Sequence, residues 1–137
     1  MKNSIAKRLL FWAILLGGVA VLLGAFGAHG LRNALNESRL EAFKTGVFYQ
    51  FIHVFALILA AWLLEHSSNR AFFWAGVCFL FGIFCFSGSL YVIAFSTALG
   101  WLGATDSVGL LGLITPLGGV FFMTGWAFLA RGVSKLS

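Results

Sequence analysis

The charged side chains of this 137-residue chain all lie outside four long apolar runs. Residues 9–31, 45–64, 71–105 and 107–130 contain no Asp, Glu, Lys or Arg. An α-helix rises about 1.5 Å per residue, so about 20 apolar residues cross the ~30 Å hydrocarbon core of a bilayer. Each run is long enough to do so. The pattern predicts an all-α integral membrane protein, a four-helix bundle that crosses the bilayer four times.

The composition supports the same class of protein. Apolar residues make up 61% of the chain and charged residues 9%, and the mean hydropathy is +0.98. Too little polar surface remains to coat a water-soluble globule. Four spans and three connections leave no room for a separate soluble domain. We therefore expect one transmembrane domain over residues 1–137, with helices at about 9–30, 39–64, 71–94 and 108–130.

The basic residues near the ends of the spans predict an orientation. Six lie at the N-terminus, in the second connection and at the C-terminus: Lys2, Lys7, Arg8, Arg70, Arg131 and Lys135. The first connection holds three, Arg32, Arg39 and Lys44, and the third holds only Asp106. Lys and Arg accumulate on the cytoplasmic side of bacterial membrane proteins. The excess predicts that both termini are cytoplasmic and that the protein lies in a bacterial cytoplasmic (inner) membrane.

The first connection also carries a helix-start signal. Ser38 precedes Glu41 by three residues, the spacing of a capping box, in which each side chain bonds a free backbone N–H. Leu40 and Phe43 share one face of the helix that follows. We expect the second helix to begin before the membrane does, with a short amphipathic extension over residues 39–44 at the interface.

The third charge-free run is too long for one span. Its 35 residues, 71–105, exceed an ordinary transmembrane helix. We end this helix near Ala94 and expect residues 96–106, which include Gly100 and Gly103, to form an interfacial loop. Tryptophans near the ends of runs are expected at the membrane–water interfaces: Trp12, Trp62, Trp74, Trp101 and Trp126.

Small residues recur along one face of three predicted helices, where helices in lipid can approach closely. Pro116 in the last helix deprives the carbonyl of Gly112 of its usual donor, so we expect a bend or a bound polar partner there. These faces indicate either tight packing or a cavity lined by backbone. They consist of Ala20, Gly24 and Ala28; of Cys78, Gly82, Cys85 and Ser89; and of Gly112, Pro116 and Gly119.

Neutral polar side chains inside the spans are the candidate functional residues, because burying them in hydrocarbon costs free energy unless they find partners. Tyr49, Gln50 and His53 share one face of the second helix. The whole set can form one polar layer in the half of the bundle away from the termini. Two interpretations stay open: a ligand or proton-handling pocket, and a hydrogen-bond network that locks the bundle. The set comprises His29, Tyr49, Gln50, His53, Ser87, Ser89, Tyr91 and Thr115.

Four segments, in order along nearly the whole chain, resemble a family of small bacterial membrane proteins of the YgdD and YwdK type. They are residues 24–30 (GAFGAHG), Tyr49-Gln50 followed by His53, residues 87–91 (SGSLY), and residues 115–119 (TPLGG) followed by Trp126. The resemblance implies a four-helix membrane protein and supports the choice of polar residues. It implies no reaction, because the family has no defined biochemical activity.

The residues themselves favour no catalysis and no cofactor. Cys78 and Cys85 are separated by about 10.5 Å of helix rise, too far for a disulfide, and with the scattered histidines they lack the spacing of a metal site. His29 and His53 differ in depth by about 9 Å, which disfavours haem held between them. We therefore expect no catalytic residues, no metal and no cofactor.

These observations favour a non-enzymatic multi-pass membrane protein with a buried neutral polar layer. We expect that layer to stabilise the bundle and to be able to bind a lipid, a quinone or another small ligand. The expected partners are membrane lipids and, as an open alternative, further copies of the chain or subunits of a larger membrane complex. The net charge of +5 favours anionic headgroups over nucleic acid. The alternative function is a small histidine-dependent transporter or channel.

Overall fold

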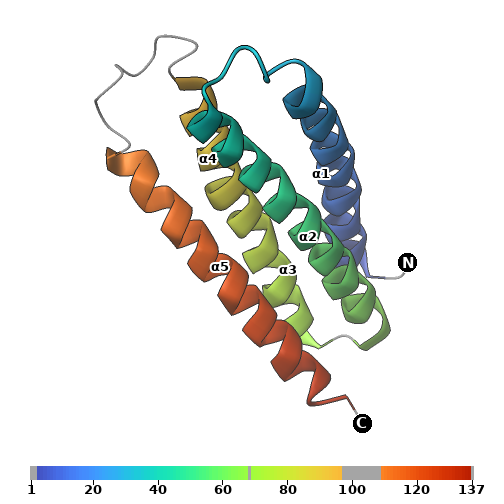
Figure 1. Cartoon of the computed structure of the whole chain (residues 1–137). Helices are drawn as coiled ribbons and strands as arrows, with labels where there is room; N and C mark the ends of the chain where they lie inside the picture. Colours follow the sequence, from blue (N-terminus) through green and yellow to red (C-terminus); the bar gives the residue numbers. More distant parts are fainter. Residues whose placement is uncertain (1–2, 68, 97–108, 137) are drawn as a thin grey trace.

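The computed structural model describes residues 3–67, 69–96 and 109–136, and within these ranges all regular structure is helical (Figure 1). The elements are α1 (Ser4–His29), α2 (Glu37–Ser67), α3 (Arg70–Gly82), a π-helical segment η1 (Ile83–Ser87), α4 (Gly88–Ser96) and α5 (Gly109–Val133). The segments α3, η1 and α4 follow one another without a break and form one span. Four helices of the described chain are therefore long and apolar enough to cross a membrane. The predicted fold class is confirmed.

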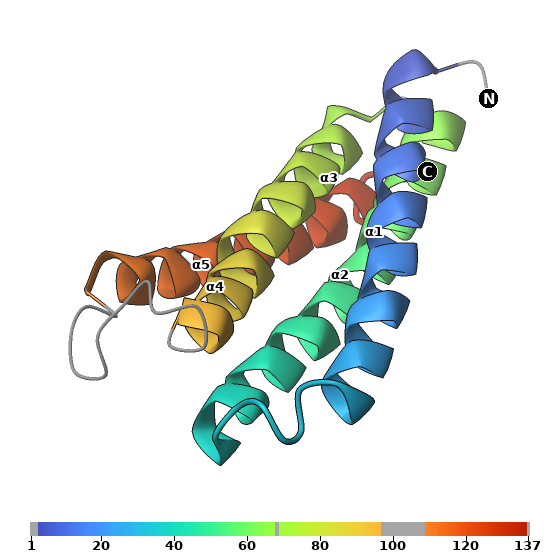
Figure 2. The same ribbon diagram turned by 90° about the horizontal axis from the view of Figure 1, so that it is seen from above.

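The spans run up and down, with α1 and α5 on opposite sides of the bundle and the other two between them (Figures 1 and 2). Both ends of the chain lie beside the connection between α2 and α3. The backbone N–H of Asn3 donates to Oε2 of Glu65 at 3.0 Å, and Nδ2 of Asn69 donates to the carbonyl of Gly132 at 3.4 Å. We call this the terminal end and the other the distal end. That the terminal end is cytoplasmic stays a prediction.

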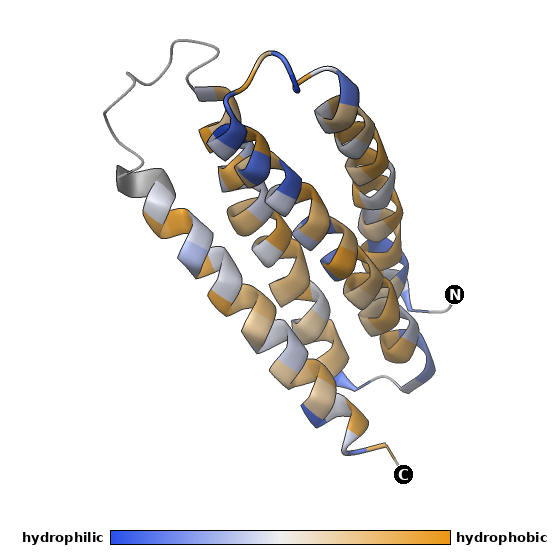
Figure 3. Cartoon of the chain, in the orientation of Figure 1, coloured by the Kyte–Doolittle hydropathy of each residue, from blue (hydrophilic) through white to orange (hydrophobic). Residues whose placement is uncertain are grey.

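The helices extend beyond the charge-free runs that predicted them. The side chain of Asn3 accepts hydrogen bonds from the N–H groups of Ile5 and Ala6, so α1 begins one turn before the first apolar run. Asn caps free backbone donors well. The side chains of Lys7 and Arg8 are exposed, so the helix can include both residues without burying their charges. Apolar residues cover the helices, and hydrophilic ones gather at their ends (Figure 3).

The predicted capping box at the start of α2 is wrong. The side-chain oxygen of Asn36, not that of Ser38, accepts from the N–H of Arg39 at 2.9 Å, and the helix begins at Glu37. Asn is at least as good a cap as Ser and comes two residues earlier, so Ser38 lies within the first turn. The amphipathic extension is present, because α2 begins before the charge-free run with Glu41 and Lys44 exposed, but its apolar side chain Phe43 is buried against other helices and does not face the interface.

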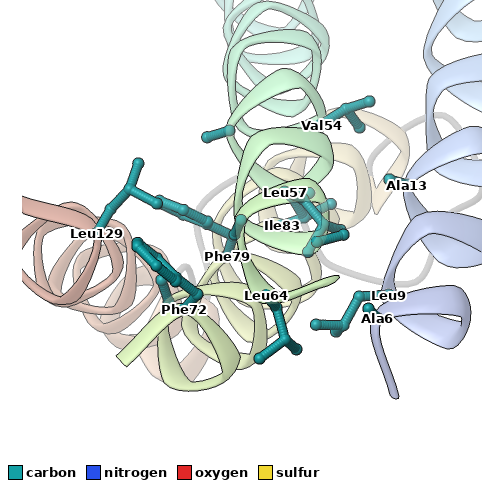
Figure 4. Packing of buried hydrophobic residues seen from close by; sticks show 14 of the residues in the cluster. Ala6, Leu9, Ala13, Val54, Leu57, Leu64, Phe72, Phe79, Ile83 and Leu129 are labelled. Atoms are coloured by element: carbon teal, nitrogen blue, oxygen red, sulfur yellow. The ribbon is translucent and has the colours of Figure 1, made fainter. Parts of the chain in front are cut away.

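Most of the buried core lies in the terminal half of the bundle. Small residues of α1, Ala6 and Ala13, let it lie close to α2 and α3, where Leu9 and Leu57 fill the space beside Gly76 (Figure 4). A second, smaller cluster lies near the distal end. Its buried members are Leu31, Phe43 and Ala94.

The seam between α5 and the third span is built from matched phenylalanines and glycines. A Cβ on any of three α5 glycines would lie within 3.0 Å of a phenylalanine of the third span. These phenylalanines and glycines each recur every seven residues, the repeat that keeps one face of a helix toward a neighbour. Phe122 of α5 fills the reciprocal position over Gly82. The three matched pairs are Phe72 with Gly132, Phe79 with Gly125, and Phe86 with Gly118.

This seam corrects the small-residue face predicted for α5. Pro116 is exposed, and nothing lies within 4 Å of a Cβ built on Gly119. The packed glycine is its neighbour Gly118, whose added Cβ would lie 2.4 Å from the backbone nitrogen of Phe86. The predicted face is wrong in register and not in period, because Gly112 and Gly119 are also seven residues apart but lie one position, about 100° around the helix, from the face of Gly118. On α1, Ala20 is buried as expected but Ala28 is exposed.

The predicted interfacial loop over residues 96–106 falls almost wholly outside the described residues. Ser96 itself is the last residue of α4, two residues beyond the predicted helix end. Trp101 also lies outside the described part. The other four tryptophans are between 44% and 55% exposed, as expected for side chains that face lipid or its interface: Trp12, Trp62, Trp74 and Trp126.

Candidate functional site

Gln50 links three helices through its side-chain amide. The hydroxyl of Tyr91 on α4 donates to Oε1 of Gln50 at 2.8 Å, and Nε2 of Gln50 donates to the backbone carbonyl of Leu16 on α1 at 2.7 Å. Gln50 is only 2% exposed. Gly46, one turn before it on α2, makes the contact possible, because a Cβ there would lie 2.8 Å from the ring of Tyr91. Amide and phenol thus satisfy each other inside the bundle.

His53, three residues after Gln50 on α2, contacts α5, and both of its ring nitrogens are engaged. Its Nδ1 lies 2.8 Å from the carbonyl oxygen of Tyr49, and the indole N–H of Trp126 on α5 donates to Nε2 at 3.3 Å. A carbonyl only accepts and an indole only donates, so these partners require the neutral tautomer with its proton on Nδ1. The imidazole also stacks on Phe122, with ring centroids 3.4 Å apart. These contacts leave neither nitrogen available as a haem or metal ligand.

A third polar contact joins α4 and α5. The hydroxyl oxygens of Ser89 and Thr115 lie 2.6 Å apart, and the Ser89 hydroxyl also donates to the carbonyl of Phe86. The close approach of Gly118 to the backbone of Phe86 holds the two helices near enough for this bond.

Tyr49 belongs to the His53 contact through its carbonyl and through its ring, which stacks beside the imidazole with centroids 5.9 Å apart. Tyr49 is 37% exposed, and its ring also packs against Phe86, 4.5 Å between centroids. The other two predicted residues lie apart from these contacts. His29 is exposed at the distal end of α1. Ser87 is fully buried in η1, and its hydroxyl makes no hydrogen bond within the described part of the chain. The structure thus divides the predicted set into three separate interhelical contacts, around Gln50, His53 and Ser89, and leaves His29 and Ser87 outside them.

Sequence reasoning missed several partners. Trp126 was assigned to the interface, yet it bonds His53. The guanidinium of Arg39 donates to the carbonyl of Ile93 and to the hydroxyl of Ser96 at 2.9 Å, so a cation of α2 binds the C-terminal end of α4. The negative end of a helix attracts such a cation, but nothing in the sequence pairs these two distant segments.

Hollows lie beside the distal half of α1, and two of them are lined mainly by apolar residues. One, of about 180 Å³, is lined by Leu16, Val19 and η1–α4 residues and reaches Gln50 and Tyr91. The other, of about 370 Å³, lies between α1 and α2. We call it the α1–α2 groove; its lining is Gly24, Gly27, Phe43, Lys44, Val47, Phe48 and Phe51. Among the described residues, no group of three His, Cys, Asp or Glu side chains can hold a metal ion.

The fold and these contacts define a multi-pass helical membrane protein whose helices are joined by neutral hydrogen bonds, with no charged side chain buried among the residues that the structure describes. Residues 23–119 match the family described as "Protein of unknown function (DUF423)", and the chain belongs to this family.

Several members resemble the chain over most of their length. The UPF0382 inner membrane protein YgdD of Escherichia coli is 34% identical, with 96% of this chain and 92% of that protein covered. The UPF0382 membrane protein YwdK of Bacillus subtilis is 37% identical, covering 89% and 95%. A UPF0382 membrane protein of Staphylococcus saprophyticus is 37% identical, covering 86% and 89%. No solved structure matches the chain. These relatives support the predicted family and its place in a bacterial inner membrane.

Proposed function

We propose that this chain is a non-enzymatic membrane protein whose buried polar side chains fix the packing of its helices, so that ligands bind on its lipid-facing surface. One observation carries the proposal: the polar atoms of Gln50, a central candidate, are paired with Tyr91 and Leu16 on two other helices. Polar side chains commonly hold membrane helices together in this way. A group already paired with protein must give up those bonds before it can hold a ligand.

The alternative, histidine-dependent transport, has less support. A histidine that carries protons must accept one at its free nitrogen, and Nε2 of His53 already accepts from Trp126. A second proton there would break that bond and place a charge among the rings of Phe79 and Phe122. Proton-coupled flux in proteoliposomes that disappears in His53→Ala would reverse this preference.

The test removes the Gln50 bonds and measures stability. Gln50→Leu keeps a similar volume but loses both interhelical bonds, so we expect the free energy of unfolding in mixed micelles to fall by about 1–2 kcal/mol. Thr124→Val is the matched control, because the Thr124 hydroxyl bonds only the carbonyl of Val120 in its own helix. We expect its effect to stay below about 0.5 kcal/mol. Equal effects of the two substitutions would show that Gln50 does not lock the bundle.

A further inference from the structure

The α1–α2 groove continues into a second, more polar hollow at the distal end. That hollow, of about 230 Å³, is lined by Gly27, Ala28, Arg32, Leu40 and Lys44. Gly27 and Lys44 line both hollows, so the two form one path along α1. Phe48, 61% exposed, lines the groove, which therefore opens on the outer face of the bundle.

The path changes in chemistry along its length. Its deeper part is lined by glycine, valine and phenylalanine, whereas its distal mouth carries two exposed cations, Arg32 and Lys44. Two carboxylates of α2 lie at this end, Glu37 in its first turn and Glu41, whose carboxylate lies 3.5 Å from the Lys44 ammonium. Both side chains of the Lys44–Glu41 pair are exposed, and such pairs are weak enough for another anion to displace.

We propose that this path binds one anionic glycerophospholipid, with the phosphate at Arg32 and Lys44 and an acyl chain along the α1–α2 groove. An apolar channel that ends in cations at the level of the helix ends matches a lipid whose charged headgroup lies at the interface and whose chains lie in hydrocarbon. Each basic residue near a membrane surface attracts anionic headgroups. The proposal rests on the proposed function in one respect, that ligands bind on the outer face and not at the buried polar contacts.

The same charges disfavour a second copy of the chain as the occupant. A two-fold symmetric contact brings the same patch of both copies together, so Arg32 and Lys44 would face their own counterparts at the same depth. Like charges so placed repel each other, whereas a phosphodiester is of opposite sign to both.

The experiment measures lipid adducts of the full chain by native mass spectrometry in a neutral detergent. Dioleoyl phosphatidylglycerol and dioleoyl phosphatidylcholine, which share their acyl chains, are titrated separately. We expect a 1:1 phosphatidylglycerol adduct at roughly tenfold lower lipid concentration than the phosphatidylcholine adduct. The double variant Arg32→Gln/Lys44→Gln should lose this preference, whereas Arg131→Gln/Lys135→Gln, which removes two exposed cations from the terminal end, should keep it.

A second pair of variants tests the groove. A Cβ on Gly24 lies 3.6 Å from Val47, so Gly24→Leu can fold and fill the groove, and it should weaken binding of both lipids. Gly18→Leu is its control on the same helix, because a Cβ built on Gly18 has nothing within 4 Å and Gly18 lies outside the groove.

Equal affinity for the two lipids, or an unchanged preference in Arg32→Gln/Lys44→Gln, would overturn the proposal. Inorganic phosphate that abolishes the adduct would identify a phosphate site without a lipid groove. Gln50 does not line the path. The stability test on Gln50→Leu and the lipid-preference test on Arg32→Gln/Lys44→Gln can therefore fail independently of each other.

Discussion

The two outer helices of the bundle are attached in different ways. On one side, α5 meets the third span along a continuous seam, in which the rings of Phe79 and Phe72 and the backbone of Phe86 lie against glycines of α5. On the other side, α1 packs closely in its terminal half, around Leu9 and Gly76, and again at Gly27, where an added Cβ would lie 2.8 Å from the Phe43 ring. Elsewhere in its distal half it is flanked by hollows. In lipid, helices associate through packing because no water is expelled. The closed seam is therefore suited to rigidity and the open one to ligands.

The largest expected effect is at the tightest point of the closed seam. Gly118→Ala places a methyl group 2.4 Å from backbone nitrogen, which cannot move without displacing η1. We expect the free energy of unfolding to fall by about 3 kcal/mol, the upper part of the range for overpacking. Gly119→Ala, one residue away with open space around it, is the control and should be nearly neutral. Similar stabilities of the two variants in mixed micelles would show that α5 does not pack as described.

A smaller effect is expected at Gly125, where the neighbour is a side chain. Gly125→Ala would place its methyl group 2.6 Å from the ring of Phe79, and a ring can give way in part. We expect a loss of about 1–2 kcal/mol in unfolding free energy. Phe79→Leu in the same chain should recover part of that loss by making room. If the double variant is instead less stable than the sum of the two single changes predicts, the ring and the glycine are not matched.

The smallest effect is expected on the open side. Gly24→Ala adds a methyl group 3.6 Å from Val47, an ordinary van der Waals contact. The free energy of unfolding should change by less than about 0.5 kcal/mol, measured in the same micelles. A loss as large as that of Gly125→Ala would mean that α1 is packed as tightly as α5, and the contrast between the two sides would disappear.

The sequence predicted the spans well because hydrocarbon imposes one strong rule, that charges stay outside. It predicted helix ends less well, since Asn3 and Asn36 extend α1 and α2 through caps that lie beyond the apolar runs. The cost of burying polar groups in hydrocarbon pointed to Gln50 and Tyr91, the family resemblance supported that choice, and the structure adds how they meet. The partner of Gln50 on α1 is the carbonyl of Leu16, and no side-chain pattern marks a backbone atom.

The facing sides of the helices were the hardest to predict. A helix that is apolar all round does not reveal which face is buried, so the choice of Gly119 over Gly118 was wrong. A usable signal was nevertheless present. Phenylalanine at 72, 79 and 86 and glycine at 118, 125 and 132 share a seven-residue repeat, and in an antiparallel pair such repeats align.

The most direct test of the central claim is a double-mutant cycle between Gln50 and Tyr91. The free energies of unfolding of the wild type, Gln50→Leu, Tyr91→Phe and the double variant are measured in mixed micelles. A bond between the two side chains predicts a coupling of about 0.6 kcal/mol, the average for interhelical hydrogen bonds in membranes, and at most about 1.7 kcal/mol. Additive effects would contradict the claim that these buried groups hold the helices together.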